Sequence, residues 1–237
     1  MSLSLLIIFI TGFVTIVGAG SANFRYESWS KVLTTLAYSG VALTFFKKSR
    51  NNHSLVFAIA LIFAAIADYF LSEAKHLPKE SPLNGKYFII GLALYLVGYL
   101  TIGISNIVFY SINSTTTVVF IIISIVSFII YRTLDKSKMK GIEIPVIAYL
   151  GQAVILVSSS STKLFITNFQ LPAILLALGS ICFYVSDFLI AKKTFNSNFM
   201  YSEPLILITY NCGLYFISYG ILHMPESPTL SNKQLLM

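Results

Sequence analysis

Two aspartates lie inside long apolar stretches of the sequence, where a charged side chain is costly. Asp68 falls in the run 64–71, and Asp187 falls in the run 183–190. A charge near the centre of a bilayer costs about 2.5–3.5 kcal/mol or more, so residues of this kind are candidates for function. Two such acids at matched depth favour a functional pair, Asp68 and Asp187. The alternative is that each is a structural group that pairs with a Lys or Tyr, or lies shallow enough to reach water.

Other polar residues occur at comparable depth in neighbouring apolar segments. Taken singly, each tyrosine is more typical of an interfacial anchor, and a lysine at the start of a helix is typical of a side chain that reaches the interface. Together they predict a polar cavity with a basic entrance, suited to an amphiphile with a phosphate head group. The residues predicted to bind this substrate are Lys31, Tyr99, Tyr149, Tyr210 and Asn211.

The composition indicates which elements must position these residues. Of 237 residues, 56% are hydrophobic and 11% are charged, and the mean hydropathy is +0.80. A soluble domain carries about 25% charged residues, and a helix needs about 20 apolar residues to cross the hydrocarbon. We therefore expect an all-α integral membrane protein, with residues 1–223 as one transmembrane domain and 224–237 as a disordered tail.

Eight membrane spans fit the apolar runs, and we expect a bundle of eight transmembrane helices. The long charge-free run from Tyr87 to Tyr131 is divided where Asn, Ser and Thr gather, and a polar loop is predicted over 73–86. The first span is expected to be retained rather than cleaved as a signal peptide, because it has no basic start. The predicted spans are 3–22, 29–46, 53–72, two within 87–131, 144–161, 169–191 and 203–222.

The loops predict an orientation for the bundle. Loops after odd-numbered spans carry eleven Lys and Arg residues, against five in the other loops and the tail, so the odd side is expected to be cytoplasmic. Asp68 and Asp187 each lie about four residues before the end of spans running in the same direction, so both should reach that leaflet. The motif Asp-aromatic-apolar-apolar recurs after 119 residues, which would make the bundle a 4+4 parallel repeat.

Several kinds of site lack support in the sequence. It contains no CxxC, HExxH or P-loop motif, so we expect no metal and no other cofactor. The net charge of +7 follows from the basic loops, and we expect no nucleic-acid partner. Cys182 and Cys212 both fall in apolar spans and are expected to be small buried residues. The oligomeric state is left open.

The segment from Leu178 to Phe195, with the aspartate near the end of span three, resembles the YhhN-like family, which includes the lysoplasmalogenases. Asp68 fits a family aspartate, with Ala67 in place of the usual glycine, and Lys31 fits a lysine at the start of span two. Tyr149 and Tyr210 also fit family positions. The family residues matched in span seven are Gly179, Phe183, Ser186, Asp187, Ala191 and Phe195.

The resemblance implies a hydrolase acting on a lysophospholipid with a vinyl-ether chain, in the bacterial inner membrane or the endoplasmic reticulum, depending on the host. Its products would be a fatty aldehyde and a glycerophospho-base. The resemblance implies that Asp68 and Asp187 are the catalytic residues, one carboxyl kept protonated by burial beside a like charge and the other ionised. Two positions depart from the family: Tyr99 stands where a histidine is common, and Cys212-Gly213 stands where Ala-Gln is common. Two alternatives remain open: a proton-coupled transporter, and a lipid-binding relative without catalysis.

Overall fold

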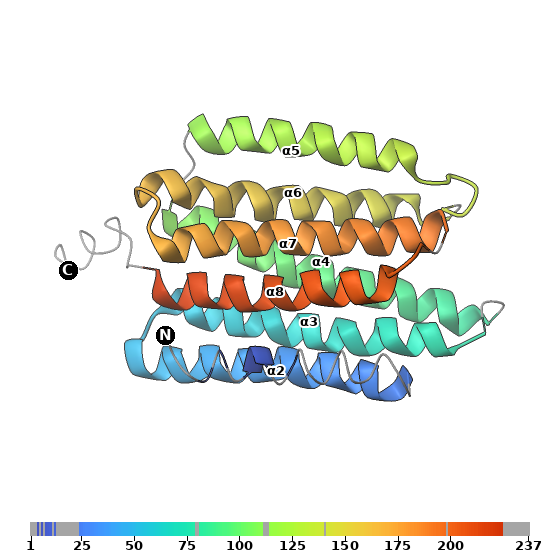
Figure 1. Cartoon of the computed structure of the whole chain (residues 1–237), viewed down its shortest axis with the longest axis horizontal. Coiled ribbons are helices and arrows are strands. Elements are labelled where there is room, and N and C mark those ends of the chain that lie inside the picture. The colour runs from blue at the N-terminus through green and yellow to red at the C-terminus, as the bar shows by residue number, and fades with distance from the viewer. Residues whose placement is uncertain are drawn as a thin grey trace.

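A computed structural model shows a bundle of long, roughly antiparallel helices (Figure 1). It describes residues 4, 6, 8–10, 12, 24–78, 81–110, 114–139, 141–197 and 199–224. Within these ranges all regular structure is helical. The helices are α2 (Phe24–Ser49), α3 (Asn52–His76), α4 (Pro82–Tyr110), α5 (Ser114–Thr133), α6 (Glu143–Ile166), α7 (Leu171–Phe195) and α8 (Ser202–His223).

Six of these helices, α3 to α8, are long and apolar enough to cross a membrane. The expected eight spans are thus confirmed in part. The helix α2 forms as predicted but is not among the six, because Ser, Thr and Tyr interrupt its apolar residues. The first predicted span and the predicted tail fall largely outside the described residues, and the 4+4 repeat stays a prediction.

The helices alternate in direction along the bundle. In Figure 1, α3, α5 and α7 run one way, while α2, α4, α6 and α8 run the other way. The ends of α3 and α7 and the start of α8 therefore lie at one end of the bundle. This arrangement places the second halves of α3 and α7, which carry Asp68 and Asp187, beside the first half of α8. The two aspartates were expected at the same end for this reason.

Both helix ends that flank the predicted loop 73–86 differ from those predicted. The loop expected over 73–86 is shorter, because α3 continues to His76 and α4 begins at Pro82. The side chain of Ser81 accepts a hydrogen bond from the backbone N–H of Leu83 (3.3 Å), and proline is well suited to the first turn of a helix. A serine–proline pair that looked like loop is therefore a helix start.

Close helix contacts depend on residues with little or no side chain. A Cβ atom on Gly98 of α4 would lie 2.9 Å from the carbonyl oxygen of Ala60 on α3. A Cβ atom on Gly179 of α7 would lie 2.7 Å from the backbone nitrogen of Ile217 on α8. Small residues allow membrane helices to approach closely, and these contacts fix the spacing of the helices that carry the two aspartates.

Candidate active site

The two aspartates lie at the same distance from one end of the bundle. Asp68 is eight residues before the last residue of α3, and Asp187 is eight residues before the last residue of α7. At 1.5 Å per residue, each is about 12 Å from its helix end. Each residue is only 7% exposed, so neither carboxyl lies on the lipid surface.

Asp68 is held by hydroxyl groups from three other helices. Its Oδ1 accepts a hydrogen bond from the Tyr95 hydroxyl (2.5 Å) on α4. Its Oδ2 accepts bonds from Tyr210 (2.7 Å) on α8 and Thr35 (3.2 Å) on α2. Three donors aimed at one carboxyl group suit the ionised form, because a carboxylate only accepts hydrogen bonds.

Asp187 has a much sparser set of partners. Its Oδ1 accepts a bond from the Tyr149 hydroxyl (2.7 Å) on α6, and this is its one hydrogen bond within the described part of the chain. The second carboxyl oxygen is left for another group. This arrangement suits a carboxylic acid that holds a proton on that oxygen and can donate it.

Aromatic side chains connect the two aspartates. The ring of Tyr99 packs against Tyr95 (5.2 Å between centroids) and Phe183 (5.0 Å), and Phe183 packs against Tyr210 (5.5 Å). Tyr99 interacts electrostatically with both carboxyl groups, as does Tyr149. The two acids therefore belong to one cluster lined by rings.

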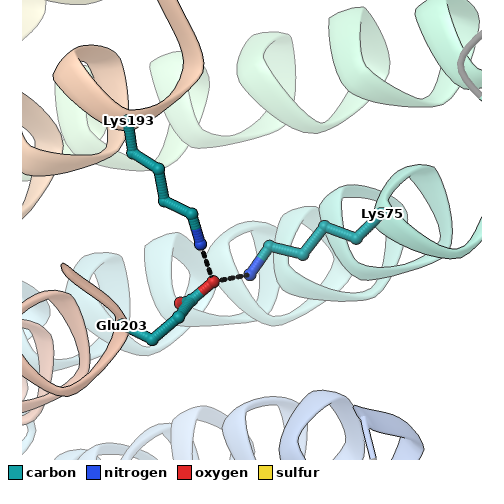
Figure 2. Close-up of polar contacts among 3 residues, drawn as sticks. All are labelled: Lys75, Lys193 and Glu203. Atoms are coloured by element: carbon teal, nitrogen blue, oxygen red, sulfur yellow. Dashed lines mark hydrogen bonds and ion pairs between the residues drawn. The ribbon is translucent and has the colours of Figure 1, made fainter. Parts of the chain in front are cut away.

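Lys31 lies at the outer side of this cluster. It interacts electrostatically with Asp68 and with Glu203, which is in the first turn of α8. Glu203 accepts a hydrogen bond from Lys193 at the end of α7 and forms a longer ion pair with Lys75 near the end of α3 (3.7 Å). Figure 2 shows these three side chains converging from three helices.

Four of the five predicted substrate-binding residues lie in or beside this cluster, namely Lys31, Tyr99, Tyr149 and Tyr210. Asn211 does not join them. Its amide donates to the carbonyl of Leu207 one turn earlier (3.0 Å), and its side-chain oxygen lies near Gly12. Neighbouring positions on a helix point about 100° apart, so Tyr210 and Asn211 face different partners.

Thr35, Glu203 and Tyr95 were not predicted from the sequence as site residues. Helical spacing could have found the first and the last of these. Thr35 is one turn after Lys31, and Tyr95 is one turn before Tyr99. Glu203 gave no such signal, since it sits at a helix start where acids are common.

A second buried polar cluster lies near the opposite end of α3, α4 and α6. Lys163 is fully buried and donates to Asn106 Oδ1 (2.7 Å), whose amide donates to Ser160 (3.2 Å). His53 is also buried, with its ring 5.0 Å from that of Phe109. The prediction that Lys163 lies in a loop is therefore wrong, because α6 continues past it to Ile166.

Metal binding is not suggested by the described part of the chain, where no three His, Cys, Asp or Glu side chains gather closely enough to hold an ion.

The helices and the buried polar clusters define a multi-pass helical membrane protein. The model of the YhhN family matches residues 26–221, and the chain belongs to this family. No curated protein and no solved structure gives a significant match.

Proposed function

We propose that this protein is a membrane-embedded hydrolase that cleaves the vinyl-ether bond of a lysoplasmalogen. The products are a fatty aldehyde and a glycerophospho-base. The observation that carries the proposal is the pair of buried aspartates at matched depth with contrasting partners. Asp68 accepts three hydroxyl hydrogen bonds, whereas Asp187 accepts one.

Vinyl-ether cleavage needs both a proton donor and a stabilising negative charge. Protonation of the carbon–carbon double bond gives an oxocarbenium ion, which captures water to form a hemiacetal. The hemiacetal then collapses to an aldehyde and an alcohol. A similar positive charge develops in glycoside hydrolysis, for which enzymes also use two carboxyl groups.

Asp187 is the proposed acid. Its single donor, Tyr149, fixes one carboxyl oxygen and leaves the other to carry the proton. When that proton moves to carbon, the carboxylate formed is stabilised by the same tyrosine, because hydrogen bonds to ionised groups are the stronger ones.

Asp68 is the proposed counter-charge. Its three hydroxyl partners keep the carboxylate fixed in place, and a preorganised charge stabilises a developing cation without reorganisation. Asp68 remains ionised throughout, so no proton needs to leave it.

The cycle balances with one water molecule. Asp187 gives a proton to carbon, and its carboxylate then takes a proton from the water that attacks the oxocarbenium ion. The same group then gives a proton to the ether oxygen and takes the proton of the hemiacetal hydroxyl, so that the bond to glycerol breaks as the aldehyde carbonyl forms. Asp187 ends the cycle protonated, as it began.

The test is aldehyde release by the purified protein in detergent or nanodiscs. A lysoplasmalogen should give free aldehyde and glycerophospho-base in equal amounts, while the matched lysolipid with a saturated ether should give none. Equal inertness towards both lipids, with the vinyl-ether lipid still bound, would favour a lipid-binding relative over a hydrolase.

The second polar cluster supports one competing proposal, a proton-coupled transporter. Buried ionisable groups at both ends of the bundle, such as Asp68 and Lys163, suit a path through both leaflets. A fluorescent lysophospholipid in proteoliposomes, with an impermeant quencher outside, measures this directly. Transfer between leaflets driven by a pH gradient, without aldehyde, would favour the transporter.

A further inference from the structure

Glu203 connects the three helices that carry the main groups of the candidate site. It pairs with Lys193 and Lys75, as Figure 2 shows, and all three side chains are between 24% and 43% exposed. Lys75 lies seven residues after Asp68 on α3, and Glu203 lies seven residues before Tyr210 on α8. The ion-paired cluster is therefore about 10.5 Å further out than the Asp68 carboxyl.

One carboxylate oxygen of Glu203 can still accept a hydrogen bond. Both lysines approach Oε1 of Glu203, while Oε2 is buried and has no hydrogen-bond donor among the described residues. A buried acceptor of this kind is destabilising, and more so when it is charged, unless a donor reaches it. A group that reaches this oxygen as a donor must carry an N–H or O–H bond.

We propose that Glu203 is the residue that selects the head group, accepting a hydrogen bond from a primary ammonium, as in phosphoethanolamine. This inference rests on the proposed function and names the substrate within it. A quaternary ammonium carries the same charge but has no N–H to donate, and phosphoglycerol carries no positive charge. Ethanolamine lipids, which carry both the charge and the N–H donors, should therefore be preferred to choline lipids and to glycerol lipids.

The spacing along the helices fits such a substrate. An extended chain advances about 1.2 Å per bond, which places the phosphorus about 6 Å and the amine nitrogen about 11 Å from the vinyl-ether oxygen. Lys31 lies one turn, about 6 Å, from Thr35, whose hydroxyl contacts Asp68. With the vinyl ether beside Asp68, the phosphate reaches the depth of Lys31 and the amine reaches Glu203.

The test compares Glu203→Gln with the wild type on lysoplasmalogens that differ only in the head group. The ratio of kcat/KM for ethanolamine over choline should fall about tenfold, because a hydrogen bond between charged groups is lost. Glu203→Asp keeps the charge and should give an intermediate ratio, and it provides the measurement if the glutamine variant does not fold.

The matched control is Asp135→Asn, which removes one exposed negative charge beside the end of α7, where the backbone N–H of Asp135 donates to Asn196 (3.0 Å). It should leave the head-group ratio unchanged. If Glu203→Gln lowers kcat/KM equally for all head groups, Glu203 is only structural and the proposal is wrong.

Failure of the proposed function itself would be seen separately. If the wild type releases no aldehyde, the same head groups are compared by binding of lysophosphatidylethanolamine and lysophosphatidylcholine in nanodiscs. Preference for the primary amine that Glu203→Gln abolishes supports the head-group site without hydrolysis. An unchanged preference overturns it.

Discussion

Tyr149→Phe should slow the chemical step without weakening substrate binding. The hydroxyl of Tyr149 is 2.7 Å from Oδ1 of Asp187 and is its one hydrogen-bond donor among the described residues. In the proposed cycle Asp187 is neutral before proton transfer and ionised after it. A hydrogen bond to a charged group contributes about 1.5–3 kcal/mol, against about 0.5–1.5 kcal/mol for a neutral pair.

The difference, about 1–1.5 kcal/mol, is the stabilisation that Tyr149 adds on the way to the transition state. At 1.36 kcal/mol for each factor of ten, kcat should fall about five- to tenfold with KM nearly unchanged. The assay is steady-state aldehyde release per folded molecule, with the folded fraction taken from thermal melting in detergent.

The matched control is Tyr184→Phe. Tyr184 is on α7, one turn before Asp187, but its hydroxyl bonds Ser127 of α5 instead (2.8 Å). This variant should keep wild-type kcat. Unchanged kcat in Tyr149→Phe, or an equal loss in Tyr184→Phe, would refute the assignment of Asp187 as the acid.

Three further changes test the packing and the polar groups. Gly179→Ala should lower the stability of the α7–α8 contact by about 1–3 kcal/mol, because the new Cβ meets α8, whereas Gly151→Ala, with nothing within 4 Å, should leave the melting temperature unchanged or raise it slightly. Lys163→Met should lower the melting temperature, since Asn106 loses a buried donor worth about 1–3 kcal/mol, while aldehyde release per folded molecule stays at the wild-type level. A loss of turnover there would implicate the second cluster in function. Lys31→Ala should raise KM by up to about fivefold at constant kcat, because a partly exposed charge contributes about 1 kcal/mol or less, and an unchanged KM would remove its role in binding phosphate.

The apolar runs were sufficient to predict the six apolar helices α3 to α8, because a membrane span must be long and mostly apolar. The same reasoning found Asp68 and Asp187, since a charge in such a run stands out in the sequence. It failed at helix ends. Lys163 falls between the predicted spans 144–161 and 169–191 and was therefore predicted to lie in a loop, whereas the packing of α4 against α6 places the side chain of Asn106 beside it.

The sequence did not reveal which side chains contact one another between different helices. Thr35 and Tyr95 reach Asp68 from α2 and α4, and no pattern within one helix specifies which hydroxyl meets which carboxyl. Asn211 shows the opposite error, because its polarity suggested the site while its orientation takes it elsewhere. The sequence was enough to predict how far along a helix a side chain lies. The direction in which it points around the helix axis, and so its partner, depends on how the neighbouring helices pack.

The most direct test of the central claim is aldehyde release by Asp68→Asn and Asp187→Asn, measured on a lysoplasmalogen per folded molecule. Asparagine nearly preserves the shape of aspartate, but it can neither protonate carbon nor carry the counter-charge. General acid–base groups contribute about 10²–10⁴-fold, and loss of a preorganised charge adds to this, so both variants should lose at least about 99% of turnover while still folding. Loss of a general acid or base usually leaves less than about a hundredth of the activity. If both variants keep more than about a tenth of wild-type turnover, the two-carboxylate mechanism is wrong.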